Sequence, residues 1–154
     1  MGNHYMVRPL GIWPVDWQNA VFDPACPPVD EPGRYPSFVE LRQVLESFEE
    51  YDIAHLSGAF SHDFILHPAG MTFAPGQPRL YVAWLEVEEA EDEFHPTRLG
   101  FSGGSPEVMV RILERLAQRC GTQILLPDTG WPAIVVTPGM DIAAVIAAWN
   151  ARLG

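Results

Sequence analysis

The sequence predicts a single α+β domain, with about three helices packed on a mixed or mostly antiparallel sheet. Apolar residues recur at helical spacing in three segments, and shorter apolar runs that are typical of strands lie between them. The chain has 154 residues, 47% of them hydrophobic, which suffices for one domain with one core. We therefore treat residues 1–154 as one domain.

The N-terminal part is apolar but rich in proline. Residues 5–22 contain Pro9 and Pro14, which cannot donate a backbone hydrogen bond, so we expect an edge strand followed by an aromatic-rich loop. The Trp13–Trp17 stretch either covers the core, which is the favoured interpretation, or recognises a partner. Residues 23–36 hold five prolines and are expected to form an extended, non-helical connector.

The first helix is expected to begin after Ser37, a good N-cap that forms a capping box with Glu40. Its buried stripe is expected to comprise Phe38, Leu41, Val44, Leu45 and Phe48. Three acids, Glu46, Glu49 and Glu50, lie largely on the other side, at the negative end of the helix dipole. A solvated face is the common explanation for such charges, and a binding surface is the alternative.

Short β-like runs fill the rest of the chain. In the longest, Arg79–Glu89, the odd-numbered residues from Tyr81 to Val87 line one face, with Glu86 and Glu88 on the other. The expected strands are Asp52–Ser57, Asp63–His67, Arg79–Glu89, Arg98–Ser102, Thr122–Leu126 and Pro132–Thr137.

Two further helices have clear start signals. The second has Ser105 as N-cap and Pro106 at its first position, and Gly121 is placed to end it. Its expected buried residues are Val108, Ile112, Leu113, Leu116 and Ala117. The third is capped by Asp141 and runs to about Arg152. Its expected inward residues are Ile142, Val145, Ile146 and Trp149.

A helix-strand-strand order occurs twice, in residues 36–71 and 105–140. When the chain is shifted by 69 residues, six positions of these units are identical. This indicates an internal duplication, in which both units share one sheet and their helices lie on one face.

The net charge of −11 is concentrated in the middle of the chain. Residues 40–93 carry two Arg against twelve acids, whereas residues 94–154 carry five Arg against four acids. Such a field repels nucleic acid and anionic membranes and attracts basic partners, although ordinary solubility also explains it. The candidate partner-binding residues are Glu46, Glu49, Glu50, Glu86, Glu88, Glu89, Glu91, Asp92 and Glu93.

The expected location is the cytoplasm. The N-terminus lacks the basic and apolar regions of a signal peptide, and no apolar run is long enough to span a bilayer. Cys26 and Cys120 are expected to be free thiols, as in a reducing cytosol.

The histidines offer a metal site as an alternative. His55, His62 and His67, together with Asp63, would bind zinc if strand ends brought them together, but their spacing matches no known ligand motif. His95 lies beside several acids, where an ordinary surface histidine is favoured over a divalent-ion ligand. We therefore expect no metal and no cofactor.

No catalytic motif is favoured either. The glycines before Ser105 resemble an anion cradle but lack the P-loop lysine, and a turn into an N-cap explains them. Asp128, Thr129 and Gly130 match the aspartic-protease triplet by letters, yet one aspartate cannot supply a dyad, so a hairpin turn is favoured. Cys120 has no base nearby in sequence. The chain is not expected to be an enzyme.

In overall character the chain resembles the immunity proteins of bacterial polymorphic-toxin and type VI secretion effectors, which are small, acidic α+β proteins without catalytic residues. The resemblance implies a non-catalytic protein that plugs or masks the active site of a cognate toxin with a basic surface, and that binds neither nucleic acid nor membrane. The acids named above would supply the charge, and an exposed Trp would supply an anchor.

Two other functions stay open from the sequence. One is an acidic nucleic-acid mimic or phage-type inhibitor of a DNA-handling protein. The other is a small metal-binding enzyme that uses His55, His62 and His67.

Overall fold

The computed structural model describes residues 4–9, 33–58, 61–70, 79–85, 99–127 and 134–153. The elements in chain order are β1 (His4–Pro9), α2 (Phe38–Glu46), β2 (Tyr51–Ser57), β3 (Ser61–Pro68), β4 (Leu80–Leu85), β5 (Leu99–Ser102), α3 (Pro106–Cys120), β6 (Gln123–Pro127), β7 (Ile134–Val136) and α4 (Ile142–Leu153). This is the predicted α+β single domain.

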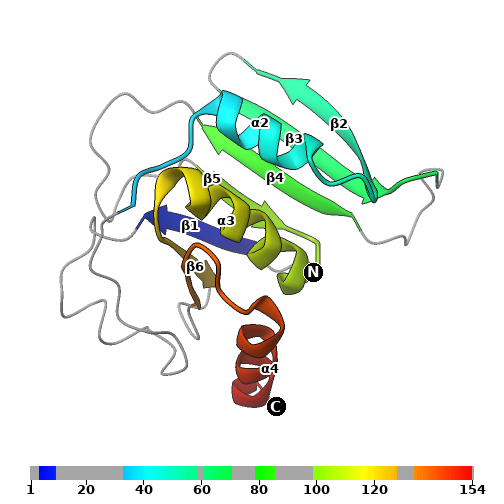
Figure 1. Ribbon diagram of the computed structural model, residues 1–154. Helices are drawn as coiled ribbons and strands as arrows, with labels where there is room; N and C mark the ends of the chain where they lie inside the picture. The colour runs from blue at the N-terminus through cyan, green and yellow to red at the C-terminus, as the bar shows by residue number, and fades with distance from the viewer. Residues whose placement is uncertain are drawn as a thin grey trace.

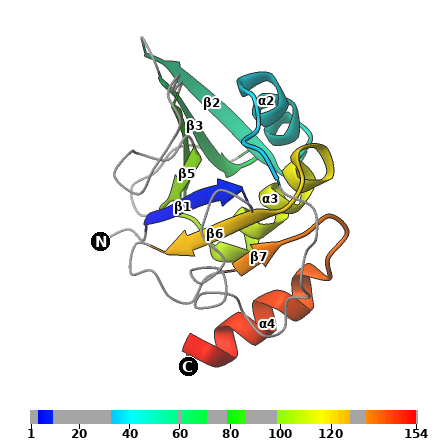
Figure 2. The same cartoon turned by 90° about the vertical axis from the view of Figure 1, so that its left-hand side faces the viewer.

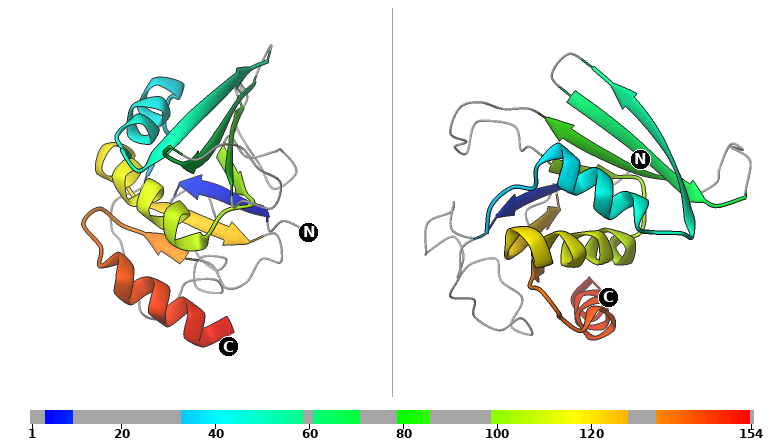
Figure 3. Two further views of the ribbon diagram at one scale, coloured as in Figure 1. Left: turned by 90° about the vertical axis from the view of Figure 1, so that its right-hand side faces the viewer. Right: turned by 45° about the horizontal axis from the view of Figure 1, so that its top comes forward.

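The seven described strands form one sheet in the order β2-β3-β4-β5-β1-β6-β7, and every neighbouring pair is antiparallel. α2 and α3 lie side by side on one face of this sheet (Figure 1 and Figure 3). α4 follows β7 and packs against α3 (Figure 2). Of the two predicted forms, a mixed or a mostly antiparallel sheet, the structure has the antiparallel one, and the placement of the first two helices on one face is confirmed.

β1 corrects one expectation, because it lies in the middle of the sheet rather than at an edge. It pairs with β5 on one side and with β6 on the other. Pro9 is the last residue of the strand, so its missing N–H falls where the ladder ends. A proline at a strand end therefore does not identify an edge strand.

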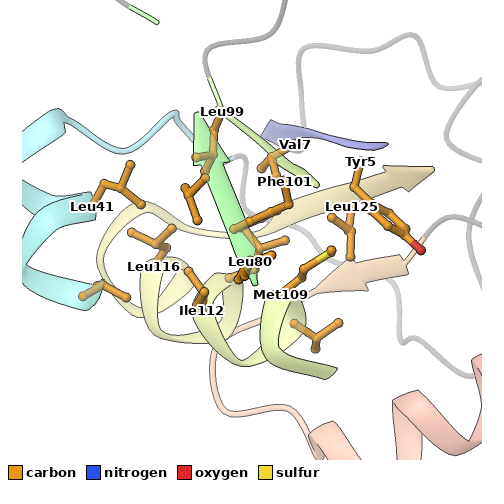
Figure 4. Close-up of a cluster of buried hydrophobic side chains, with 14 of the residues drawn as sticks. Tyr5, Val7, Leu41, Leu80, Leu99, Phe101, Met109, Ile112, Leu116 and Leu125 are labelled. Atoms are coloured by element: carbon orange, nitrogen blue, oxygen red, sulfur yellow. The ribbon is translucent and has the colours of Figure 1, made fainter. Parts of the chain in front are cut away.

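The core lies between the sheet and the pair α2–α3. Alternate strand residues such as Val7, Phe64 and Leu99 turn toward the helices and are completely buried. Four residues of the predicted stripe of α2 are buried, Leu41, Val44, Leu45 and Phe48, and Phe38 is partly buried against the same cluster. Figure 4 shows how strand and helix residues meet in this cluster.

α3 is buried over a wider arc than its sequence stripe predicts. Met109 and Val110 are fully buried, whereas Val108, which the stripe includes, is only partly buried. The cause is the position of the helix, which contacts the sheet, α2 on one flank and α4 on the other. A one-faced stripe is expected only for a helix with one neighbour.

Three arginines of α3 reach across to the C-terminal half of α2 and the turn that follows it. Their partners are given by the pairs Arg111–Glu50 (2.6 Å), Arg115–Ser47 (2.7 Å) and Arg119–Gln43 (2.6 Å). The Arg115 guanidinium also lies 3.8 Å from the ring centre of Phe48, close enough for a cation–π contact. The positive charge of these arginines lies near the C-terminal end of α2, where it stabilises the negative end of the helix dipole.

The predicted helix caps are confirmed. Ser37 Oγ accepts from the Glu40 backbone N–H, and the Glu40 carboxylate accepts from the Ser37 N–H. Ser105 and Asp141 cap α3 and α4 through their side-chain oxygens. Gly121 follows the end of α3 at φ 81°, a conformation that favours glycine.

The end of the predicted connector, residues 33–36, is bonded to the end of α3. The Arg34 N–H donates to the Cys120 carbonyl at 2.8 Å, and the Gln123 side-chain amide donates to the Arg34 carbonyl at 2.7 Å. The Arg34 guanidinium also binds both carboxylate oxygens of Glu40, at 2.7 and 2.9 Å. One glutamate therefore serves both the capping box and this tie.

Glu40 makes the stability depend on pH. Hydrogen bonds from Arg34 lower its pKa from the ordinary 4.5 to about 2. Because the folded-state pKa is depressed, this stabilisation is present above pH 4.5 and is lost as the pH falls toward 2. We expect Glu40→Gln to lower the free energy of unfolding by about 1 kcal/mol at neutral pH, because exposure of Arg34 weakens the pair, and by much less at about pH 2.5. Urea unfolding at both pH values measures this.

Glu46→Gln is the matched control. Glu46 is 64% exposed and lies 3.9 Å from Arg42, so its replacement is expected to change stability little at either pH. An equal loss from Glu40→Gln at both pH values would contradict the assigned role of the charge.

The two units of the predicted duplication are present as α2-β2-β3 and α3-β6-β7, but they sit differently in the sheet. β2, the first strand after α2, is an edge strand, whereas β6, the first strand after α3, is an inner strand. Both helices cover the same face of the sheet, and neighbouring strands run in opposite directions. When the two units are viewed from the helix side with their first strands pointing the same way, the second strand therefore lies on the right in one unit and on the left in the other. The duplication stays a hypothesis from the sequence, and the strand arrangement does not favour it.

Candidate interaction surface

The predicted acids at the end of α2 and in the turn that follows it lie on the surface, and two of the three are near an arginine. Glu50 accepts a hydrogen bond from Arg111 at 2.6 Å, which holds the pKa of Glu50 below its usual range. Glu46 lies 3.9 Å from Arg42. Glu49 is exposed and has no ion-pair partner within the part of the chain that the structure describes. The charge at this end is therefore less negative than the sequence suggests.

Asp52 adds a carboxylate at the same end and was not singled out from the sequence. Its side chain is 57% exposed, lies 3.8 Å from His67 Nε2 and accepts from the Gly70 N–H at 3.2 Å. No local pattern indicates this, because the β2–β3 register places Asp52 opposite His67. We refer to Glu46, Glu49, Glu50 and Asp52 as the α2–β2 acidic cluster.

The other predicted acids, Glu86, Glu88, Glu89, Glu91, Asp92 and Glu93, lie outside the described residues, as does His95. The described chain before them ends at Leu85, the last residue of β4, which pairs with Ser61 at the start of β3. The α2–β2 acidic cluster lies at the other end of these strands, near Tyr51. About 20 Å of strand separates Leu85 from this cluster.

An exposed tryptophan anchor was also expected, and Trp84 does not provide one. Its indole is buried and donates to the Pro36 carbonyl at 3.1 Å. Trp84 lies with Leu80 and Val82 on the face of β4 that the helices cover, while Tyr81 on the other face is 42% exposed. Trp13, Trp17 and Trp131 lie outside the described residues, and the Trp149 side chain is not described.

Two of the candidate histidines meet in an aromatic cluster under the start of α2. His55 Nε2 and His62 Nδ1 share a hydrogen bond of 2.9 Å. Phe38 stacks on His62 at 3.9 Å between ring centres, and Phe64 stacks on His55 at 4.7 Å. Since one ring nitrogen must accept, at least one of the two imidazoles carries no proton on the nitrogen that faces the other.

His67 does not join this pair. It lies on the opposite face of β3, because residues 62 and 67 differ in strand parity, and it is opposite Asp52 in the register. Across the described ranges, no group of three His, Cys, Asp or Glu side chains is placed to hold a metal ion. The predicted alternative of a site built from His55, His62 and His67 is therefore wrong in its geometry.

Cys120 is a buried free thiol beside Glu40, with its sulfur 3.7 Å from the carboxylate. Burial, with the neighbouring carboxylate, raises the pKa of Cys120 to about 11. The group is thus a protonated thiol at neutral pH, the form that is a poor nucleophile. Cys26 lies outside the described residues.

The sheet face away from α2 and α3 carries a shallow cavity of about 420 Å³ over β4, β5 and β1. Small residues, Ala83 and Gly100, line it together with Met6, Asp63 and Tyr81. Met6 is 39% exposed, which is high for a strand residue in mid-sheet. No local pattern in the sequence indicates this surface, because it depends on β1 lying beside β5.

Comparison of the chain with protein-family models, with curated proteins and with solved structures finds no significant match. None of the helices that the structure describes has the length and apolar character needed to cross a membrane.

Proposed function

We propose that the protein is a non-catalytic inhibitor of the immunity type, which binds a cognate toxin or effector domain with a basic surface in the cytoplasm. The observation that carries the proposal is the concentration of charge: residues 40–93 hold twelve acids against two Arg. A preformed negative surface raises the rate at which a basic partner is captured.

The described part of this segment supports such a surface at one end of the sheet. The α2–β2 acidic cluster has three side chains about half exposed or more, Glu46 at 64%, Asp52 at 57% and Glu50 at 49%. Glu49 is exposed and unpaired among the described residues. Among the described residues, Glu46 and Glu49 can meet basic side chains of a partner without first losing an internal hydrogen bond, whereas Glu50 is bonded to Arg111 and Asp52 to the Gly70 N–H.

Co-expression with the product of the neighbouring gene tests the proposal. We expect a stoichiometric complex and protection of the cells from the toxicity of that product. The inhibitor function would be ruled out if the neighbouring gene product is basic and yet forms no complex with the protein and the cells are not protected.

Charge reversal then tests the surface. Reversing Glu46 and Glu49 to Lys, or Glu88 through Glu93 to Lys, is expected to slow association about tenfold at low salt, with a smaller effect at high salt. Stopped-flow or surface-based kinetics at two salt concentrations measures this. Glu107→Lys with Glu114→Lys on α3 makes the same change as the first pair and is expected to alter the rate far less. An unchanged rate and salt dependence in the first two variants would rule out the acidic surface.

A further inference from the structure

The two edges of the described sheet differ greatly. β7 has three residues, all buried. β2 has seven residues, and it pairs with β3 in continuous register from Tyr51 opposite Pro68 to Ser57 opposite His62, without a bulge. Leu56 near the end of β2 is 59% exposed, the highest value among the large apolar residues of the described chain. β2 is therefore a long, regular and accessible edge.

Backbone hydrogen bonds show which groups of β2 face outward. The Gly58 N–H donates to the Ser61 carbonyl, and the Ala69 N–H donates to the Glu50 carbonyl. In an antiparallel ladder these bonded positions alternate, so even-numbered residues of β2 direct their N–H and C=O groups toward β3. Ile53, His55 and Ser57 consequently direct theirs to the edge.

β2 lacks the features that usually protect a sheet edge. Proteins block exposed edges with proline, lysine, bulges or very short strands. The sequence YDIAHLS contains no proline, no lysine and no arginine, and its register has no bulge. An edge with outward N–H and C=O groups and no such block is suited to accept another strand.

Charge favours a basic strand over a second copy of the chain. Asp52 lies on β2 itself, and Glu49 and Glu50 immediately precede it. Pairing two β2 edges would bring together two chains that each carry a net charge of −11. A strand rich in Lys or Arg would instead pair its backbone with β2 and its side chains with the acids.

We propose that β2 accepts an extended basic segment of the partner protein as an eighth strand of the sheet. This inference rests on the proposed function, since it names how the inhibitor would hold its partner. Backbone pairing along Ile53, His55 and Ser57 would supply affinity, and the α2–β2 acidic cluster would select positive side chains.

The test uses a labelled synthetic peptide of alternating Lys and Val, about nine residues long, and fluorescence anisotropy with the intact protein. We expect the peptide to bind, and the same peptide with all amides N-methylated not to bind, because methylation blocks strand pairing while keeping the charge. A peptide with Glu in place of Lys is also expected not to bind.

The matched variants are His55→Pro and His55→Ala. Both remove the imidazole, but only proline removes the N–H that faces the edge, and an edge strand tolerates proline there. We expect His55→Pro to weaken peptide binding about tenfold or more and His55→Ala to change it less than about threefold. Far-ultraviolet circular dichroism and urea unfolding check that both variants fold, and Ser57→Pro gives a second edge variant should His55→Pro unfold.

Three outcomes would overturn the inference. The first is a failure of the Lys–Val peptide to bind, or equal binding of its N-methylated form. Equal binding would show that charge alone, without strand pairing, holds the peptide. The second is a dimer of the protein alone, seen by sedimentation and lost in His55→Pro, which would make a second copy the occupant. The third is a complex with the toxin partner that His55→Pro leaves unchanged. In that last case the inhibitor function stands and only the use of β2 fails.

Discussion

Replacing Leu116 with alanine is expected to lower the free energy of unfolding by about 3 kcal/mol, the typical cost of opening a cavity at a buried leucine. Leu116 is fully buried on α3 and belongs with Leu41 and Ile112 to the cluster in Figure 4. Because α3 contacts the sheet and both other described helices, the cavity would have little freedom to collapse. Urea unfolding at neutral pH measures the loss.

Gln118→Ala on the same helix is the control for this prediction. Gln118 is exposed, and its side chain bonds only with Glu114 among the described residues. Its loss is expected to cost less than about 0.5 kcal/mol. A Leu116→Ala loss of similar size would show that α3 is not packed as the structure has it.

Replacing Gly33 with alanine is expected to cost about 2 kcal/mol through steric overlap. A β-carbon at Gly33 would lie 2.1 Å from the Thr122 carbonyl oxygen, and that atom is backbone, which cannot turn aside. Relief requires residues 33–37 to move away from β6, which would break the bond from Gln123 to the Arg34 carbonyl. Thermal or urea unfolding would report the loss.

Gly70→Ala separates this effect from backbone strain. Gly70 has φ 79° and no heavy atom within 4 Å of an added β-carbon, so only the left-handed conformation costs, about 1 kcal/mol. If Gly33→Ala proved as mild as an ordinary surface change, the close approach of the connector to Thr122 would be wrong.

Local signals in the sequence predicted the helices well. Ser37 with Glu40, Ser105 with Pro106, and Gly121 each act within a few residues, so their effect does not depend on distant partners. The strand positions also followed from apolar runs between turns. What failed was the place of a strand in the sheet: the prolines near β1 indicated an edge, but the partners of β1 are found only after residue 98.

The candidate surface was harder to predict for the same reason. The sequence shows that Glu50 is acidic, but its partner Arg111 is 61 positions away and comes from another helix. The sequence shows three histidines close together, but strand parity sends His67 to the other face. The edge position of β2 is likewise a property of the whole sheet. The sequence shows where charged residues lie along the chain, but it does not show which side chains form pairs or which ones are exposed.

The central position of β1 has a consequence for the order of folding. β1 is made first but pairs with Leu99–Ser102 and Gln123–Pro127, so the middle of the sheet cannot close until most of the chain has been synthesised. The hairpin β2–β3 and its neighbour β4 are close in sequence and can pair earlier. Such distant pairing costs chain entropy before it stabilises anything, which slows folding to about the millisecond-to-second range. During translation, β1 would stay unpaired until β5 and β6 have been synthesised. An N-terminal fusion that delays the pairing of β1 would slow folding without lowering the stability of the folded protein.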